Sequence, residues 1–190
     1  MKIIGITGKS GTGKTKIASL LSQKLNCKHV DIDKIGHLAS SNPEILAELC
    51  QKFGNEILDE NNNLDRKKLG NIVFSQENDM RCLSDLTINF IYKNIDEIIS
   101  LENNQFIILE WILLPNSKYW ENCDCKVLIT SNDIIRKQKV LKRDNISEEY
   151  FNKRDSASLN YSPYSFDCIF ENDYQEETIE KILNKIIDMN

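Results

Sequence analysis

Residues 8–15 read Gly8-Lys9-Ser10-Gly11-Thr12-Gly13-Lys14-Thr15 and fit the pattern G-x-x-x-x-G-K-[ST] at every fixed position. In such a loop, glycines let backbone N–H groups curl around a β-phosphate without side-chain clashes. The lysine reaches the β- and γ-phosphates, and the last hydroxyl binds Mg²⁺. The stretch therefore predicts a nucleotide-phosphate site. Its expected contact residues are Ser10, Gly11, Thr12, Gly13, Lys14 and Thr15, with Lys14 also catalytic and Thr15 also a metal ligand.

The residues on either side of this loop give it the structural context that the motif requires. The run from Lys2 to Thr7 is apolar and rich in isoleucine, as in a buried parallel strand. After Lys14, apolar residues recur at helical spacing as far as Leu25. A helix that starts here directs its positive end at the bound anion. Strand, glycine loop and helix in this order disfavour a chance match.

The rest of the chain alternates between predicted strands and predicted helices. Further buried strands are expected at residues 106–109, 126–129 and 167–170, and an amphipathic helix at 179–187. This alternation predicts an α/β fold with a mostly parallel sheet and helices on both faces. Residues 144–165 are polar and carry charges of both signs, so they are expected to form an exposed helix and loop that can serve as a lid.

Composition narrows the classes of partner. The chain has 190 residues, 41% of them hydrophobic, which suits a single domain over residues 1–190. The net charge of -5 and the absence of a long basic run argue against a nucleic-acid surface. The sequence has no run of roughly 18 apolar residues, the length a membrane span requires. Six scattered cysteines, with only Cys123 and Cys125 closely spaced, favour reduced thiols over a zinc site and hence the cytoplasm. No oligomeric state is predicted.

Three acidic residues are candidates for the chemistry. Asp31 and Asp33 are expected on one side of a short strand that ends in acids, at the sheet edge where ligands bind in open α/β folds. One carboxylate can hold a magnesium-bound water, and the other can accept a proton from a substrate hydroxyl. Glu110 follows the run 106–109 and can support Mg²⁺. The alternatives are that Asp33 caps a helix and that Glu110 is a partly solvated strand end.

Arg136, Lys139 and Arg143 are three and four residues apart, so they share one face of a predicted helix. They either contact phosphate oxygens or form a solvated face, and for Arg143 the phosphate role is favoured. His29 and His37 are interpreted as structural or surface residues.

Two short motifs imitate those of GTPases. Asn152-Lys153-Arg154-Asp155 fits the guanine-reading pattern N-K-x-D, and Asp33-Lys34-Ile35-Gly36 fits D-x-x-G. The first lies in a charged helical stretch, whereas a guanine motif follows a buried strand. The second comes too soon after Lys14 to leave room for a switch loop. Both are interpreted as chance matches.

Several segments together resemble the dephospho-CoA kinase family over nearly the whole chain. Leu64-Asp65-Arg66 is similar to the family's L-D-R segment, and Arg143 to Glu149 is similar to its R-D-G-L-S-E-E segment. These two are the most specific. The opening Ile4 to Gly8, the run Val30 to Asp33 and the ending Asp167 to Asn172 resemble the family's other motifs.

The resemblance implies a P-loop kinase three-layer fold, with a five-stranded parallel sheet flanked by helices, a helical substrate region at about 60–100 and a lid at about 144–165. It implies ATP-dependent phosphorylation of the 3′-hydroxyl of dephospho-CoA, with ATP and Mg²⁺ as cofactors. In this reading Asp33 is the base and Arg143 faces the ATP phosphates. Asn172 lies by the adenine. With Asp33 as the base, the acids expected at the strand ends, Asp31 and Glu110, remain together with Thr15 for the metal.

The chain departs from the family at substrate and lid positions. Ile88-Asn89 stands where the family usually has His-Pro, Pro115-Asn116 stands near the end of its D-I-P-L-L-F-E segment, and Ser158 replaces a glutamine. Two alternatives therefore stay open. One is that the chain is a P-loop kinase for another small acceptor, such as a nucleoside or nucleotide. The other is that it is a catalytically weakened nucleotide-binding homologue.

Overall fold

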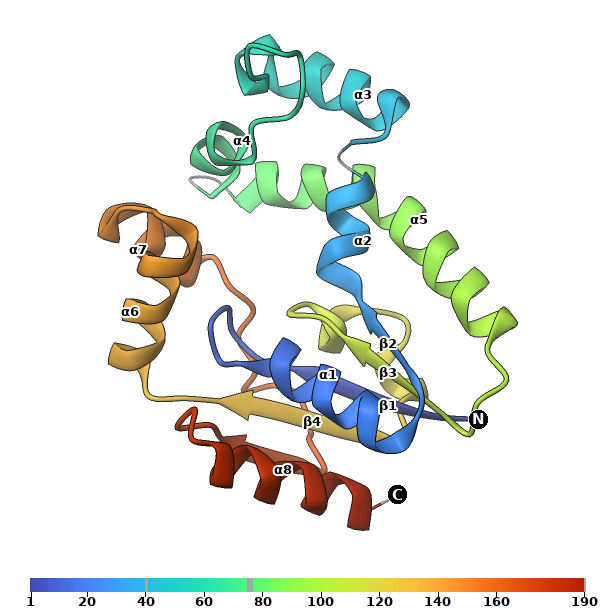
Figure 1. Ribbon diagram of the computed structural model, residues 1–190. Helices are drawn as coiled ribbons and strands as arrows, with labels where there is room; N and C mark the ends of the chain where they lie inside the picture. Colours follow the sequence, from blue (N-terminus) through green and yellow to red (C-terminus); the bar gives the residue numbers. More distant parts are fainter. Residues whose placement is uncertain (40, 75–76, 190) are drawn as a thin grey trace.

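A computed structural model describes residues 1–39, 41–74 and 77–189, and it contains a five-stranded parallel sheet in the order β2-β3-β1-β4-β5 (Figure 1). The predicted five-stranded parallel sheet is confirmed. Because β1 is central, its backbone pairs with β3 on one side and β4 on the other. The strands are β1 (Lys2–Thr7), β2 (Lys28–Asp31), β3 (Phe106–Glu110), β4 (Cys125–Thr130) and β5 (Cys168–Glu171).

Helices connect the strands, as parallel pairing requires. No helix in the described part of the chain is long and apolar enough to cross a bilayer. The α-helices are α1 (Lys14–Leu25), α2 (Ile32–Ala39), α3 (Pro43–Phe53), α4 (Arg66–Val73), α5 (Glu77–Leu101), α6 (Asp133–Asp144), α7 (Glu148–Ser156) and α8 (Glu176–Asp188). Short 3₁₀ turns lie at η1 (Asn55–Ile57), η2 (Leu114–Asn116) and η3 (Trp120–Asn122).

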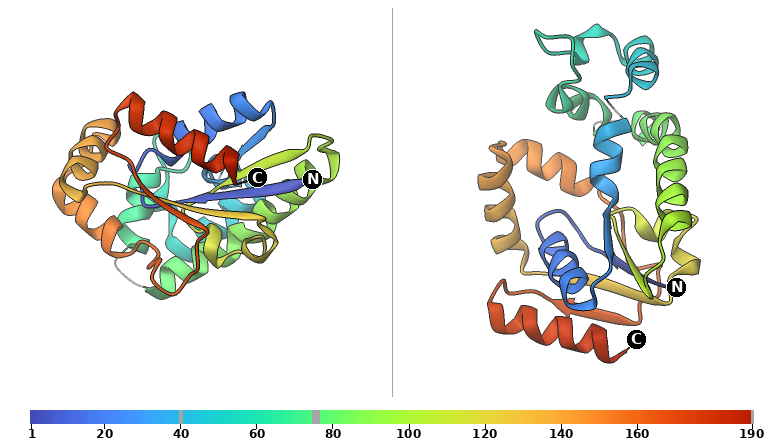
Figure 2. Two further views of the ribbon diagram at one scale, coloured as in Figure 1. Left: turned by 90° about the horizontal axis from the view of Figure 1, so that it is seen from below. Right: turned by 45° about the vertical axis from the view of Figure 1, so that its right-hand side comes forward.

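Each face of the sheet carries its own hydrophobic core. Ile4 and Ile6 of β1 pack in a cluster with α1 and α8, which cover one face. Ile107 and Leu109 of β3 belong to a second cluster with α2, α5 and the segment through η2 and η3. Figure 2 shows the sheet between these layers. The alternation of side chains along the strands therefore explains the three layers.

Two helical groups stand beyond the carboxyl ends of the strands (Figures 1 and 2). One group, α3 and α4, packs on its own small core, which includes Leu49 and Leu69. The other group is α6 with α7. The groups meet where the ring of Phe74 contacts the ring of Tyr150 edge-on, with centroids 6.0 Å apart. Phe74 at the end of α4, together with Arg143 and Phe151 of the other group, lines one cleft with Lys14 at the start of α1.

The start of α2 corrects one expectation from the sequence. Strand β2 ends at Asp31, and Asp33 lies in the first turn of α2 rather than on a strand beside Asp31. The carboxylate of Asp31 accepts a hydrogen bond from the backbone N–H of Lys34, at 3.2 Å. Asp31 is thus the residue that caps the helix, and the capping role considered for Asp33 is wrong.

Candidate functional site

The loop of residues 8–13 runs from the end of β1 to the first turn of α1, at the centre of the sheet edge. Two glycines are required by close backbone approaches. A Cβ on Gly8 would lie 2.2 Å from the carbonyl oxygen of Ile129, and one on Gly13 would lie 2.4 Å from the Asn172 carboxamide nitrogen. Gly13 also has a φ of 88°, which side-chain-bearing residues rarely adopt. The loop can therefore take this shape only with the glycines that the motif provides.

Asn172 and Tyr174, which follow β5, donate hydrogen bonds to backbone carbonyls of the loop. The Asn172 carboxamide is buried, and it donates a hydrogen bond of 2.8 Å to the carbonyl of Thr12. The Tyr174 hydroxyl donates to the carbonyl of Gly11, also at 2.8 Å. Because both bonds use carbonyls as acceptors, neither of them takes up a loop N–H group that could bind an anion. Asn172 thus lies at the loop backbone, and its expected contact with adenine stays a prediction.

Lys14, Asp33 and Glu110 converge beside the loop. The ammonium of Lys14 lies 3.4 Å from Glu110 Oε1 and 3.9 Å from Asp33 Oδ2. Glu110 is fully buried, so the reading of this residue as a partly solvated strand end is wrong. The paired strands β2 and β3 place Asp31 opposite Glu110 at the same edge. The structure thus brings together Asp31 and Glu110 at two strand ends and Asp33 at the start of a helix. The sequence predicted acids at this edge of the sheet.

Glu110 also contacts the residue expected at the metal. The Thr15 hydroxyl donates to Glu110 Oε1 at 3.1 Å, and His29 Nε2 lies 3.4 Å from Glu110 Oε2. A hydroxyl that donates its proton to a carboxylate directs its lone pairs elsewhere, which is the orientation that a metal ligand needs. Asp31 lies farther out, where its carboxylate pairs with Lys34 at 3.1 Å.

The carboxyl of Asp33 has a perturbed pKa of about 6, well above its usual 3.8. Loss of solvation is the largest cause, and the positive charge of Lys14 opposes it. The negative charges of Glu110 and Asp31 raise the pKa further, whereas a hydrogen bond from the Trp111 side chain lowers it. A carboxylate with a pKa near 6 is ionised at neutral pH and is a stronger base than an ordinary aspartate.

Two arginines meet at Ser10. Nη2 of Arg143 lies 3.2 Å from Ser10 Oγ, and Nη2 of Arg154 lies 3.4 Å from the same oxygen. Both guanidinium groups also bind the carboxylate of Asp144. Two positive groups from α6 and α7 therefore face the loop and share one carboxylate.

The other basic residues of α6 have different surroundings. Arg136 is buried and binds Asp133 and Asp155, so the solvated-face reading is wrong for it. The Lys139 ammonium lies over the Tyr174 ring, 4.2 Å from its centroid. Of the three residues on the predicted face, only Arg143 lines the cleft beside the loop.

A cleft of about 960 Å³ joins these groups. Its lining includes Ser10, Lys14 and Thr15 of the loop. It also includes an apolar wall, formed by Phe74, Met80, Leu83, Ile88, Ile91 and Tyr92.

The positions that depart from the family pattern divide between this cleft and its surroundings. Ile88, Asn116 and Ser158 line the cleft, so these replacements change the surface that a ligand in the cleft would contact. Asn89 is exposed, and Pro115 is buried in η2.

Sequence reasoning missed several residues at the site. Arg154 falls inside the N-K-x-D imitation and on a different helix from Arg143, so no spacing links the two. Trp111 directly follows Glu110 but carries no motif. His29 had a usable signal: it precedes Asp31 by two on β2, and such residues point to the same side of a strand.

Comparison with known proteins gives consistent matches. A family model described as dephospho-CoA kinase matches residues 2–176. The dephospho-CoA kinase of Aquifex aeolicus is 35% identical over 156 residues, which are 81% of this chain and 79% of that protein. That of Fusobacterium nucleatum is 31% identical over 185 residues, with 94% and 93% covered. The crystal structure of TT1252 from Thermus thermophilus has a TM-score of 0.79 at 24% identity and covers 98% of this chain and 96% of that one.

Proposed function

Because the chain belongs to the dephospho-CoA kinase family, we propose that its cleft holds ATP on the phosphate loop and presents the 3′-hydroxyl of dephospho-CoA to Asp33. The enzyme is an ATP-dependent kinase that phosphorylates dephospho-CoA. One observation carries the assignment of roles: the Asp33 carboxylate lies 3.9 Å from the Lys14 ammonium, the group that a phosphate loop directs at the β- and γ-phosphates.

The roles follow from the contacts at the loop. The backbone of Ser10, Gly11, Thr12 and Gly13 surrounds the β-phosphate, and Asn172 supports this backbone from behind. Lys14 neutralises charge on the β- and γ-phosphates. Arg143, which reaches Ser10 Oγ, approaches the same phosphates from α6. These fixed cations stabilise the charge that spreads over the transferred group.

Asp33 acts on the acceptor. Its carboxylate orients the 3′-hydroxyl and accepts the proton as the oxygen bonds to the γ-phosphorus and ADP leaves. We place the remainder of the long acceptor against the apolar wall of the cleft, which includes Ile88 and Tyr92. We assign residues 60–100 to acceptor binding and 144–165 to the lid of a single kinase domain.

This assignment predicts a pH dependence. Because Asp33 must be ionised to accept the proton, kcat/KM should fall by about tenfold per pH unit as the pH drops below about 6. The profile should be flat between about pH 7 and 8. Initial rates between pH 4.5 and 8, with dephospho-CoA below its KM, measure it. A wild-type profile that stays flat through pH 6 to 5 would remove Asp33 as the base.

We propose Mg²⁺ as the metal of this site. Thr15, Glu110 and Asp31 supply oxygen donors, which a hard cation prefers. No group of three His, Cys, Asp or Glu side chains among residues 1–39, 41–74 and 77–189 is arranged to hold a metal ion alone. Magnesium fits such a sparse set, because it commonly binds one or two protein oxygens and takes its other ligands from phosphates and water. When bound, it would neutralise charge on the ATP phosphates.

The magnesium proposal is tested by Glu110→Gln. The change keeps the shape of a fully buried side chain but removes the charge that orients the Thr15 hydroxyl. We expect the Mg²⁺ concentration for half-maximal rate to rise by roughly tenfold, as for other residues that orient a metal ligand. Titration of Mg²⁺ at fixed ATP measures this. An unchanged Mg²⁺ dependence would contradict the role of Glu110.

We place the enzyme in the cytoplasm and propose a small-molecule acceptor as its partner, with no nucleic acid or membrane. The support is a net charge of -5 and a cleft of a size that suits a metabolite. Binding of dephospho-CoA to the purified protein, in competition with RNA and lipid vesicles, tests this.

A further inference from the structure

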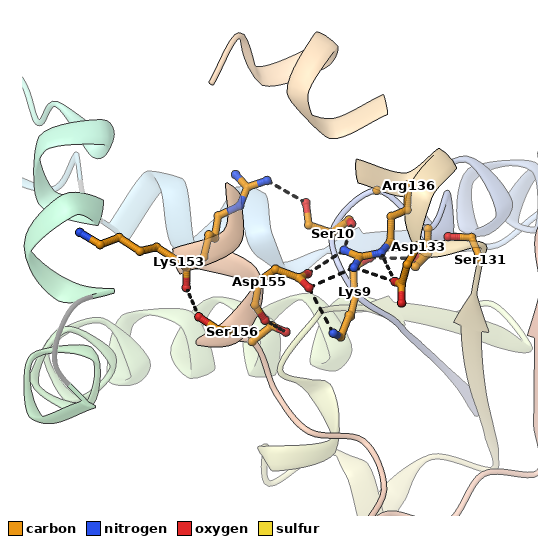
Figure 3. A network of polar contacts seen from close by, with 12 residues as sticks. Lys9, Ser10, Ser131, Asp133, Arg136, Lys153, Asp155 and Ser156 are labelled. Carbon is orange, nitrogen blue, oxygen red and sulfur yellow. Dashed lines mark hydrogen bonds and ion pairs between the residues drawn. The ribbon is translucent and has the colours of Figure 1, made fainter. Parts of the chain in front are cut away.

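A buried ion pair joins α7 to the phosphate loop. The Arg136 side chain, 3% exposed, contacts Asp155 through two parallel bonds, Nη1 to Oδ1 at 2.7 Å and Nη2 to Oδ2 at 3.1 Å. The same Nη1 donates to the carbonyl of Ser10 at 3.3 Å. On its other side Arg136 binds Asp133 at 2.8 Å. Figure 3 shows Arg136 between the two carboxylates, beside the loop.

Asp155 also reaches the loop directly. Its Oδ2 lies 3.4 Å from the ammonium of Lys9, the second residue of the phosphate-loop motif (Figure 3). Burial acts to raise the pKa of Asp155, but the hydrogen bonds and charges of Arg136 and Lys9 outweigh it and lower the pKa. The positive charges of Arg136 and Lys9 therefore balance the negative charges of Asp133 and Asp155. We call these four residues the Arg136 cluster.

The arginines on the cleft side of the loop are not matched in this way. Arg143 and Arg154 share the single carboxylate of Asp144, and both reach Ser10 Oγ. Within the group of Arg143, Arg154 and Asp144, one positive charge has no carboxylate partner, and all three residues line the cleft. That is where the phosphates of a nucleotide on the loop would lie.

Asp155 and Arg154 are neighbours on α7, so the attachment of one determines the place of the other. From these contacts we infer that Asp155 is a positioning residue for ATP: it holds α7 against Arg136 and Lys9, so that Arg154 joins Arg143 at the nucleotide phosphates. The inference rests on the proposed site for ATP at the loop. The role of Asp155 also differs from that of the aspartate in a true N-K-x-D motif, which reads a guanine base. In this chain both Asp155 oxygens bind the cations of Arg136 and Lys9 instead.

The first test is Asp155→Asn, with ATP as the probe. The variant keeps the shape of the side chain but leaves Arg136, of its two carboxylate partners, with Asp133, which is largely exposed. Loss of one partner from a buried, hydrogen-bonded charge pair carries a large cost. We expect the Kd and KM for ATP to rise by about tenfold, with a smaller change in kcat because saturating ATP itself draws α7 into place.

The matched control is Glu148→Gln. Glu148 pairs with Lys137 and so also links α7 to α6, but this pair is exposed on α7 and does not touch the loop. Exposed pairs contribute little, so ATP affinity and Tm should both stay near those of the wild type. Equal losses of ATP affinity in Asp155→Asn and Glu148→Gln would overturn the specific role of Asp155.

A second variant covers the case in which Asp155→Asn does not fold. Arg136→Met combined with Asp155→Leu replaces the buried pair by apolar side chains, an exchange that proteins often tolerate. Weaker ATP binding at a Tm near the wild-type value would support the inference. Wild-type ATP affinity in this double variant would overturn it and leave the pair a purely structural one. If the wild type itself fails to bind ATP, the proposed function is wrong.

Discussion

Lys14→Ala should lower turnover by roughly 10³-fold, a loss typical of a preorganised charge that acts in the transition state. Lys14 is buried at the base of the cleft, where its ammonium faces Glu110 and Asp33. Without it, the buried Glu110 loses a positive partner and the β- and γ-phosphates lose theirs. ATP affinity should fall as well, because the lysine contacts the ground state too. Steady-state rates and ATP titrations measure both effects.

Lys16→Ala is the matched control. Lys16 lies two residues further along α1 but is exposed to solvent. Its removal changes the net charge equally and should leave the turnover within about twofold, as for most surface substitutions. Tm should be recorded for both variants. Near-normal turnover in folded Lys14→Ala would mean that the loop is not the site of the phosphoryl donor.

Asp33→Asn is expected to have the second-largest effect, a fall in turnover of roughly 10²-fold or more, in line with loss of a general base. The amide keeps the shape of the side chain but cannot take the proton of the acceptor hydroxyl. ATP should still bind, because the loop and its cations are unchanged. Retained turnover would remove Asp33 from the catalytic residues and direct attention to Asp31.

The thermal stability of Asp33→Asn tests the raised pKa of Asp33 independently of activity. A carboxyl with a folded-state pKa of about 6, against an ordinary 3.8, favours folding less and less as the pH rises from about 4 to 6. Asp33→Asn removes this unfavourable ionisation, so its Tm at pH 7.5 should equal or exceed that of the wild type. At pH 4 the difference should vanish. Asp65→Asn, at the cap of α4, is a control in which activity should survive because asparagine caps a helix equally well.

Much of the fold could be predicted because the local signals agreed with the tertiary structure. The run Lys2 to Thr7, the glycine loop and the helix from Lys14 all form as expected. Buried parallel strands are apolar throughout, so β3 and β4 were also recognisable. Glu110 was placed at the site because it is an acid that directly follows the apolar run 106–109.

The errors arose where tertiary contacts decide the outcome. A strand can end at any of several residues, and the bond from the N–H of Lys34 to Asp31 starts α2 earlier than the pattern of acids suggested. Burial of Arg136 depends on Asp155, nineteen residues away on another helix. The contact of Arg154 with Ser10 depends on how α7 packs beside the loop. Such contacts have no periodicity in the sequence.

We expect the departures from the family pattern to affect the acceptor more than the nucleotide. Ile88, Asn116 and Ser158 line the cleft, whereas residues 8–15 keep every fixed position of the loop motif. Identification of the product made from each acceptor therefore tests the central claim most directly. The protein should be incubated with ATP, Mg²⁺ and either dephospho-CoA or a panel of nucleosides and nucleotides, and the products identified by mass spectrometry and phosphorus NMR. We predict one ADP released for each new phosphate on the 3′-oxygen of dephospho-CoA. Turnover of a nucleoside or nucleotide without any turnover of dephospho-CoA would contradict this account.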